Sequence, residues 1–395
     1  MAKGTWTKMT LGDVVELKRG YDLPERDRED GPYPIVSSSG ISGRHSKAMV
    51  KAPGVVTGRY GTLGVFHYIT EDYWPLNTAL YVRDFKGNHP RFISYFLRTL
   101  DFFAYSDKAA VPGLNRNHLH MAPVTIPDPD TQRAIAGVLG ALDDKIEVNR
   151  GIARTLEAAA RALFESWFVR FEHPATTAAA PRTSDSPLGP NSKVPDGWKV
   201  MTPWEAFEVN PTRTLSRDSD AAYLDMSNMP TQGHAPESWV RRAVGSGMKF
   251  MNGDTLVARI TPCLENGKTA FVDFLEDGEV GWGSTEYIVM RPKKPLPLVF
   301  AYCLARSDEF RTFAIRQMSG SSGRQRVPAE SLRQFFLAVP PAPIAEEFGR
   351  VVEPIFGRIK TAMEQTRALS AMRDALLPKL ISGELPVPEA LGRGD

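Results

Sequence analysis

Residues 126–146 read IPDPDTQRAIAGVLGALDDKI, and residues 339–359 read VPPAPIAEEFGRVVEPIFGRI. Both segments pass from prolines into a long helical pattern whose apolar residues recur at alternating steps of four and three. These apolar positions align at one constant spacing of 213 residues, which pairs Ile135, Leu139, Leu142, Ile146, Leu156 and Leu163 with Phe348, Val352, Ile355, Ile359, Leu369 and Leu376. The chain is therefore an internal duplication, and a duplication sets the architecture before any local motif does.

The apolar stripe of each helix is a heptad seam, which favours packing against another helix. Because the two helices have the same length and phase, we expect them to pair with each other. The alternative is that each helix packs only on its own domain, although such helices usually carry a wider apolar face. Polar residues interrupt the seam at Asn149, Thr366 and Arg373, where they can set the register of pairing.

Individual residues outside the helices also recur, and the number of residues between the two copies increases along the chain. The spacing is 192 from Trp6 to Trp198, 199 from Gly54 to Gly253, 207 from Tyr95 to Tyr302 and 213 from Leu119 to Leu332. Insertions therefore accumulate inside the two regions that precede the helices, while the helices themselves keep their length. A scaffold with variable surface loops behaves in this way.

Each region before a helix contains short β-rich runs bounded by Gly, Asn and Pro. The runs cover residues 55–57, 63–69 and 79–82 in the first region and 256–258, 269–272 and 287–290 in the second. We also predict one amphipathic helix in each region, over residues 90–105 and 298–318. The fold class is α+β, with modules at residues 1–128 and 195–341, long helices at 129–171 and 342–385, a Pro/Ala/Ser-rich linker at 172–194 and a tail at 386–395.

Composition restricts the functional classes. The 395 residues are 42% hydrophobic and 24% charged, with a net charge of only +2, so a nucleic-acid surface has to be a local patch. Cys263 and Cys303 are too few for a disulfide framework or a zinc cluster, which favours a reducing cytoplasm. The chain start shows no signal-peptide pattern, and no run approaches the roughly 20 apolar residues of a membrane span. We expect a soluble cytoplasmic protein.

Two kinds of loop have the composition of DNA-reading segments. Residues 40–65 are basic and contain no carboxylate, and residues 319–326 (SGSSGRQR) are rich in guanidinium and amide donors, as is the counterpart at 111–118 (VPGLNRNH). Arginine binds guanine and Asn or Gln binds adenine through paired hydrogen bonds, whereas Lys, Ser and Arg bind phosphates. The candidate DNA-binding residues are Arg44, Lys47, Arg59, Tyr60, Thr62, Asn115, Arg116, Asn117, Ser321, Ser322, Arg324, Gln325 and Arg326. Alone, such loops are more often plain solvent-exposed turns.

Catalytic motifs are not found. No dinucleotide-binding or P-loop glycine pattern follows a strand. Residues 210–213 (NPTR) begin like an adenine methyltransferase motif but lack the second proline and the aromatic residue, so we interpret them as a turn. His118 and His120 have no further ligands at metal-binding spacing. We therefore predict no catalytic residue, no metal site and no cofactor bound by this chain.

The two modules, each followed by a heptad helix, resemble the specificity subunit of type I restriction-modification enzymes. The resemblance is carried by residues 55–64 (VVTGRYGTLG), by residues 119–144 with Ile126-Pro127 and the spacing of Gln132, Ile135, Leu139 and Asp143, and by residues 376–385 (LLPKLISGEL). It covers nearly the whole chain apart from the linker and the last ten residues. The second copy departs from the pattern at residues 345–347 (AEE), in the region where the first copy has residues 131–133 (TQR).

The resemblance implies two target recognition domains, each reading one half of a split site in double-stranded DNA, and two helices that form an antiparallel coiled coil acting as a ruler. It also implies two modification subunits, which bind S-adenosylmethionine, and restriction subunits attached through them, with ATP and Mg used by these partners. About 38 residues of helix span roughly 57 Å, and the DNA major groove repeats every ~34–36 Å, so this geometry permits two readers on one DNA face. The other hypotheses are a stand-alone methyltransferase or nuclease with an unrecognised active site, and a coiled-coil adaptor that binds only proteins.

Overall fold

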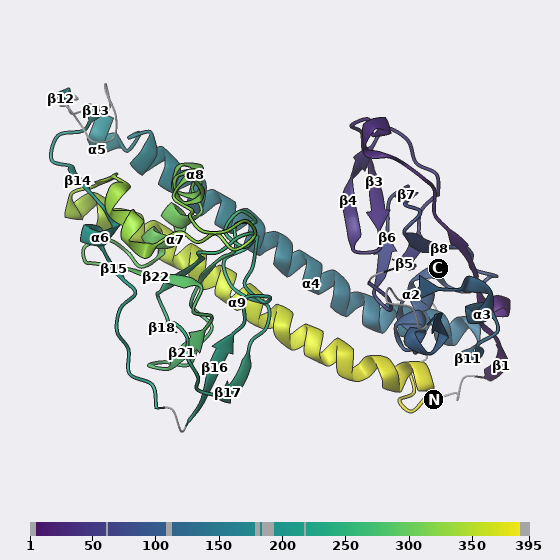
Figure 1. Ribbon diagram of the computed structural model, residues 1–395. Coiled ribbons are helices and arrows are strands. Elements are labelled where there is room, and N and C mark those ends of the chain that lie inside the picture. Colours follow the sequence, from purple (N-terminus) through teal and green to yellow (C-terminus); the bar gives the residue numbers. More distant parts are fainter. Residues whose placement is uncertain are drawn as a thin grey trace. The chain divides into compact units, whose positions relative to one another are not determined.

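The computed structural model describes residues 5–60, 62–107, 113–177, 182–183, 193–216 and 219–387. The chain folds into two compact units (Figure 1). Unit 1 comprises Met1–Lys145 and Leu369–Asp395, and unit 2 comprises Ile146–Ala368. Each unit therefore combines one of the predicted modules with parts of both long helices. Most of the predicted linker and the end of the predicted tail lie outside the described residues.

Unit 1 is built on small antiparallel and mixed sheets. A four-stranded sheet has the order β2-β8-β5-β6, a three-stranded sheet has the order β4-β3-β7, and β1 pairs with β11 and β9 with β10. The strands are β1 (Trp6–Thr10), β2 (Glu16–Arg19), β3 (Tyr33–Ser37), β4 (Gly40–His45), β5 (Gly54–Gly58), β6 (Phe66–Ile69), β7 (Trp74–Pro75), β8 (Ala79–Asp84), β9 (Ser106–Asp107), β10 (Gly113–Leu114) and β11 (Pro123–Pro127). The helices are α1 (Leu11–Val14), η1 (Glu25–Asp27), α2 (Pro90–Arg98), η2 (Phe102–Tyr105), α3 (Arg116–His120) and the long α4 (Pro129–Phe164).

Unit 2 repeats this plan with larger loops. Its sheets have the orders β15-β22-β19-β20 and β17-β16-β21-β18, and β14 pairs with β23 as β1 pairs with β11. The strands are β14 (Lys199–Met201), β15 (Phe207–Val209), β16 (Asp220–Leu224), β17 (Val240–Ala243), β18 (Lys249–Met251), β19 (Thr255–Ala258), β20 (Thr269–Phe271), β21 (Val280–Gly283), β22 (Tyr287–Pro292) and β23 (Leu337–Val339). The helices are α6 (Pro203–Ala206), α7 (Val299–Ala305), α8 (Asp308–Arg316), η4 (Ala329–Gln334) and the long α9 (Ala342–Ser382). The short elements α5 (Pro174–Thr177), β12 (Arg182–Thr183) and β13 (Lys193–Val194) fall within the predicted linker.

The α+β class is confirmed, and all six predicted strand regions contain strands, but the predicted helix limits are wrong. The helix expected over residues 90–105 ends at Arg98 and is followed by a separate 3₁₀ turn. The helix expected over residues 298–318 is two helices, because Ser307 caps the start of α8 by accepting a hydrogen bond from the Phe310 amide at 3.3 Å. Residues 63–65, at the start of a predicted strand, lie outside β6.

The long helices run antiparallel within unit 2. Asn149 of α4 donates a hydrogen bond to Gln365 of α9 at 3.3 Å, and further along α4 the ring centroid of Phe164 lies 6.1 Å from that of Phe348. Residue numbers thus rise on one helix as they fall on the other. All twelve apolar seam residues that we predicted for α4 and α9 are buried or half-buried, namely Ile135, Leu139, Leu142, Ile146, Leu156, Leu163, Phe348, Val352, Ile355, Ile359, Leu369 and Leu376.

The apolar seam residues also pack into the module cores. The alternative, in which each helix packs on its own domain, is therefore correct in part. In unit 1, Ile135 and Leu139 belong to the same apolar cluster as Phe92 and Phe96 of α2, and Leu380 of α9 joins them. The apolar stripe of each long helix contacts both the partner helix and a module. The core of each unit therefore includes side chains of both long helices. The helices therefore connect to their modules through buried side chains rather than through the chain alone.

Polar seam residues act in different ways. Arg373 of α9 donates to Asp143 of α4 at 2.8 Å in unit 1, and this bond can set register as predicted. Thr366 instead donates to the Ala362 carbonyl of its own helix. Gln132, near the start of α4, is buried and hydrogen-bonds three groups of unit 1, whereas the residue 213 positions later is a buried alanine, Ala345.

One buried tyrosine in each unit links the module to α4. Tyr95 of α2 donates to Asp143 at 2.6 Å, and Tyr302 of α7, its counterpart in the duplication, donates to Glu157 at 2.6 Å. Burial raises the pKa of both phenols, so each remains a donor at neutral pH. Glu157 is only 6% exposed, which makes the Tyr302 hydroxyl an important partner for a carboxylate that has left water.

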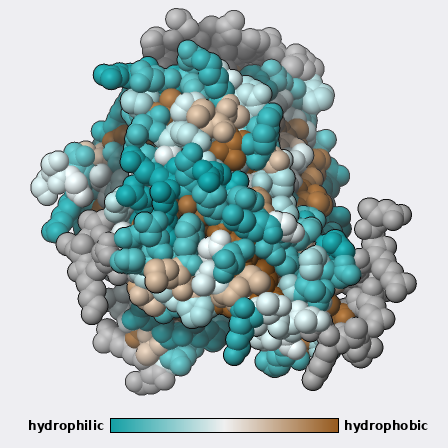
Figure 2. All heavy atoms as spheres, turned by 90° about the vertical axis from the view of Figure 1, so that its right-hand side faces the viewer, coloured by the Kyte–Doolittle hydropathy of each residue, from teal (hydrophilic) through white to brown (hydrophobic). Residues whose placement is uncertain are grey.

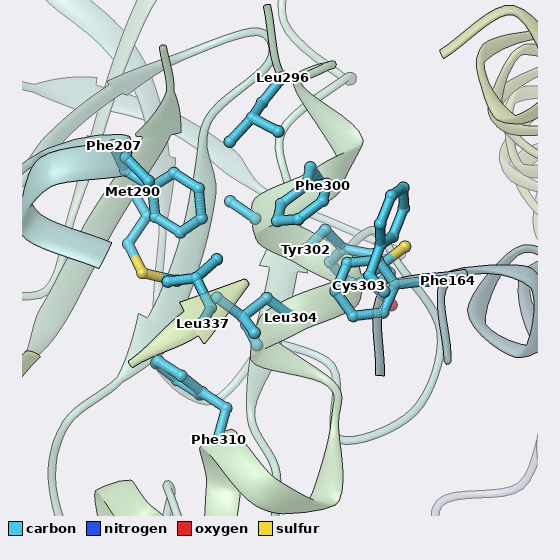
Figure 3. Close-up of a cluster of buried hydrophobic side chains, with 14 of the residues drawn as sticks. Phe164, Phe207, Met290, Leu296, Phe300, Tyr302, Cys303, Leu304, Phe310 and Leu337 are labelled. Carbon is cyan, nitrogen blue, oxygen red and sulfur yellow. The ribbon is translucent and has the colours of Figure 1, made fainter. Parts of the chain in front are cut away.

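The core of unit 2 is rich in aromatic side chains (Figure 3). Phe164 of α4, Phe300 of α7 and Phe207 of β15 meet there, with Phe164 and Phe300 centroids 5.0 Å apart. Cys303 lies in the same cluster and is 2% exposed. Burial raises the pKa of its thiol to about 12.

We predict that Tyr302→Phe lowers the free energy of unfolding of unit 2 by about 2 kcal/mol, because a buried carboxylate loses a hydrogen bond. Equilibrium urea unfolding followed by circular dichroism measures this loss. Tyr60→Phe, which removes a hydroxyl from an exposed ring, is the matched control and should change stability by less than ~0.5 kcal/mol. Equal effects of the two substitutions would contradict the assigned role of Tyr302.

We predict that Cys303 is unreactive in the folded protein. At pH 8, a thiol of pKa about 12 is ionised in only about one molecule in ten thousand, and the thiolate is the reactive form. A Cys263→Ala variant should therefore show no reaction with a thiol-specific chromogenic disulfide until denaturant is added, and then one thiol per chain. Rapid reaction of the folded variant would show that this core opens readily.

Candidate nucleic-acid interface

In unit 1, residues 59–60 of the predicted basic stretch lie against residues 113–114 of the predicted loop 111–118. Arg59 follows β5, its amide donates to the Thr78 carbonyl at 2.9 Å, and its own carbonyl accepts from the Leu114 amide at 3.0 Å. Tyr60 forms a β-bridge with Gly113. A side chain at Gly113 would collide with the Tyr60 ring, since a Cβ there would lie 2.7 Å from Tyr60 Cε1. The backbone therefore holds these two loops together.

We group the exposed or half-buried polar side chains of these two loops under the name reading surface 1. The Arg59 guanidinium carbon lies 4.7 Å from the centroid of the Tyr60 ring, which is 43% exposed. Asn115 caps α3, because its side-chain oxygen accepts from the Asn117 amide at 3.0 Å. Reading surface 1 consists of Arg59, Tyr60, Thr62, Arg116 and Asn117, which are exposed or half-buried.

Arg44 and Lys47 lie on and just after β4, outside the two loops of reading surface 1. Arg44 lies on β4, in the other sheet, and pairs with Glu71 at 3.1 Å. Lys51 pairs with Asp72 at 2.7 Å. Although the sequence from 40 to 65 contains no carboxylate, Glu71 and Asp72 partly neutralise it in the fold.

Unit 2 contains the same backbone arrangement around Arg259. Its amide donates to the Glu286 carbonyl at 2.9 Å, and its carbonyl accepts from the Val327 amide at 2.9 Å. Arg259 is thus the counterpart of Arg59, at a spacing of 200 residues. The alignment of Gly54 with Gly253, at 199, is wrong by one residue, because Gly253 with φ 91° belongs to the turn before β19 whereas Gly54 lies within β5.

The loop over residues 319–326 is a tight hairpin beside Arg259. Ser319 and Arg326 exchange two backbone hydrogen bonds, at 3.0 and 2.9 Å, and the Gln325 carbonyl accepts from the Thr261 amide at 3.0 Å. Ser321, Ser322 and Arg324 are exposed at the hairpin end, and Gln325 and Arg326 are half-buried. These five residues and Arg259 form what we call reading surface 2.

Glu286 organises the cations of reading surface 2. Arg326 Nε lies 2.8 and 2.9 Å from the two carboxylate oxygens of Glu286, and Arg326 Nη2 lies 2.8 Å from one of them. Arg259 Nε approaches the same carboxylate at 3.8 Å. The hydrogen bond to Glu286 raises the pKa of Arg326, so its positive charge is retained.

Sequence reasoning missed both Arg259 and Glu286. A signal for Arg259 was present, because the runs VVTGR (55–59) and TLVAR (255–259) each end in arginine. No signal pointed to Glu286, whose role depends on contacts with residues 27 and 40 positions away in the chain.

A second set of equivalent contacts assigns Arg44 to the framework. In unit 2, Arg241 of β17 occupies the position of Arg44 in the strand register and pairs with Glu279 at 2.7 Å, as Arg44 pairs with Glu71. Both units also place a tryptophan on the parallel strand, Trp74 or Trp282. Because this ion pair recurs at equivalent strand positions in both units, it belongs to the framework that the two units share.

The sequence motifs set aside as non-catalytic have structural explanations. Asn210 adopts φ 50°, its side chain accepts from the Val289 amide at 2.9 Å, and nearby Arg213 pairs at 2.6 Å with Asp254, which is fully buried. His120 Nε2 accepts from the Leu17 amide at 2.9 Å, so it is part of the unit 1 fold.

The face seen in Figure 2 is largely hydrophilic, with apolar side chains in small patches. Within the described ranges, no group of three or more His, Cys, Asp or Glu side chains has an arrangement suited to a metal ion. None of the helices that the structure describes is long and apolar enough to cross a membrane.

Known proteins with a similar sequence share one description. Residues 3–158 match the family model of the type I restriction modification DNA specificity domain. The chain is 24% identical over 317 residues to the type I restriction enzyme MjaIX specificity subunit of Methanocaldococcus jannaschii, a match covering 75% of this chain and 69% of that protein. It is 35% identical over 172 residues to the EcoAI specificity subunit of Escherichia coli, covering 40% of this chain and 28% of that protein.

A solved structure supports the fold. The crystal structure of the type I restriction-modification S subunit from M. genitalium aligns over 96% of both chains with a TM-score of 0.55, at 16% identity. At this identity the match shows a shared fold. Residues 3–158 match the DNA specificity domain of type I restriction-modification systems, and the chain is similar in sequence to the specificity subunits of these systems.

Proposed function

We propose that this chain is a specificity subunit that reads a two-part site in double-stranded DNA, with unit 1 reading one half through reading surface 1 and unit 2 reading the other through reading surface 2. The observation that carries the proposal is that Arg59 and Arg259 occupy equivalent positions, each with its amide and carbonyl bound to equivalent neighbours. A backbone held in this way presents its loop in a defined orientation, which recognition of base edges requires.

The chemistry of the two surfaces suits DNA. Arginine can bind guanine through two hydrogen bonds, Asn and Gln can bind adenine, and serine and arginine can bind phosphates. Surface 1 contains an arginine packed on an aromatic ring, while surface 2 contains a serine-rich hairpin with three arginines near it. Because the two surfaces differ in composition, we expect them to read different sequences.

We further propose that residues 1–128 and 195–341 are exchangeable recognition domains, and that residues 129–171 and 342–385 form the spacer between them. The buried seam of α4 and α9 supports this division, because a paired helix resists changes in length better than a loop. The half-sites would then keep a constant separation, while the sequence of each half depends on its own module.

In this proposal the chain recognises DNA and positions other subunits in the cytoplasm, and it is not itself catalytic. Two modification subunits would bind it and methylate the DNA with S-adenosylmethionine, and restriction subunits would join through them, using ATP and Mg. The enzyme alternative makes a different prediction, namely that the purified chain alone methylates or cuts DNA.

We predict that the full chain binds DNA with an affinity that falls steeply with salt, since each phosphate contact releases counterions with a slope of about −0.9 in log–log form. Replacing Arg59 by Gln should weaken binding and, where this residue contacts a phosphate, reduce that slope by about one. Lys379→Gln, which removes an exposed cation on α9, is the control. Fluorescence anisotropy over a salt series measures both the affinity and the slope of its salt dependence. A flat salt response would contradict DNA binding.

We predict that exchanging residues 1–128 for the corresponding module of a relative changes only one half of the methylated site. The seam should keep the separation of the two halves unchanged, because the helices are retained. Methylation-site sequencing of cells that express the hybrid with modification subunits reports both halves at once. A change in both halves, or in their separation, would show that the modules do not read independently.

A further inference from the structure

We propose that Glu286 is a specificity-determining residue of unit 2, which holds Arg326 so that its guanidinium reads a guanine. The inference rests on the proposed function, since it names how one of the two surfaces discriminates between bases. It starts from the arrangement of Glu286, Arg326 and Arg259 and from the corresponding positions of unit 1.

The hydrogen-bonding capacity of Arg326 is only partly used. A guanidinium has five N–H donors. Glu286 accepts from Nε and lies in contact with Nη2, and the Arg324 carbonyl accepts from Nη1 at 3.2 Å. One N–H remains on each terminal nitrogen, which matches the pair of acceptors, O6 and N7, that guanine presents in the major groove. The Arg326 side chain is 42% exposed, so these donors can be reached.

Glu286 itself is firmly positioned. Its carbonyl accepts from the Arg259 amide at 2.9 Å and its amide donates to Ser284 Oγ at 3.1 Å. Its side chain is 21% exposed. A carboxylate fixed at its backbone and bonded to Nε and Nη2 fixes the plane of the Arg326 guanidinium. An arginine without such support loses rotamer freedom when it binds a base. Arg326 has already lost most of this freedom before binding.

The described part of unit 1 has no carboxylate–arginine pair equivalent to Glu286 and Arg326. The residues equivalent to Glu286 and Arg326 are Thr78 and Gly113, as the backbone bonds of Arg59 and the bridge at Tyr60 show. Within the described part of unit 1, Arg59 has no carboxylate partner and contacts the Tyr60 ring instead. The two units thus keep the same backbone at these positions and change the side chains that face outward.

The charge of Glu286 favours specificity over affinity. It partly neutralises two arginines, which weakens attraction to any DNA phosphate, and it favours one orientation of Arg326. Removing the carboxylate should therefore have opposite effects on the two kinds of binding. Binding to the correct site should weaken, while binding to random duplex should stay equal or strengthen.

The test uses the full chain together with its modification subunits and selects bound duplexes from a random library. The variants are Arg326→Ala, Glu286→Gln and Glu286→Thr, the last of which introduces the residue that unit 1 has at this position. Arg316→Ala is the matched control, because Arg316 is an exposed arginine of α8 that lies outside reading surface 2 and forms no ion pair with a described residue. Affinities for the selected site and for random duplex are then measured at fixed salt.

We expect wild type and Arg316→Ala to select the same two-part site, and Arg326→Ala to lose selection of one guanine in one half. The Glu286 variants should lose about tenfold in affinity for the selected site relative to random duplex. An unchanged second half in every variant shows that the complex is folded.

Retention of the full site by Arg326→Ala would overturn the assignment while leaving the proposed function in place. Loss of a guanine in Arg326→Ala with wild-type discrimination in both Glu286 variants would overturn the role of Glu286. Failure of the wild type to select any two-part site would overturn the proposed function and this inference together.

Discussion

The narrow apolar stripe shared by α4 and α9 is the constraint on which the rest of the structure depends. Neither helix can bury that stripe alone, and each end of the pair also completes a module core, with Leu139 in unit 1 and Phe348 in unit 2. Tyr95 and Tyr302 add one buried hydrogen bond from each module to a carboxylate of α4. The helices are therefore part of both folded units, and a change in their length would disturb two cores.

The duplication separates contacts that support the fold from side chains available to a ligand. The backbone bonds around Arg59 and Arg259 recur, as does the ion pair of Arg44 with Glu71 in the form of Arg241 with Glu279. At neighbouring positions the two units differ: the bridge partner is Gly113 in one and Arg326 in the other. Contacts that recur in both units therefore identify the framework. Positions at which the two units differ identify the outward-facing residues.

Much of the fold follows from local patterns. The strands around residues 55–57 and 256–258 and both long helices could be predicted, because alternation and the heptad repeat are properties of consecutive residues. The break at Ser307 was missed, since a serine cap inside an apolar pattern competes with helix propensity and only the packing of α7 and α8 decides the outcome. Charge patterns were less reliable: the stretch 40–65 lacks carboxylates, yet Glu71 and Asp72 reach it through the fold.

The sequence by itself determined the duplication, the α+β class, the heptad seam and the family resemblance, all of which depend on order and spacing along the chain. Only the tertiary structure decided which candidate side chains lie together and which are already engaged. It brought Arg59 and Tyr60 beside Gly113 and Leu114, assigned Arg44 to an ion pair, and joined Arg326 to Glu286. The physical reason is that hydrogen bonds and ion pairs act over a few ångströms in space, whereas their partners here are separated by tens of residues in the chain.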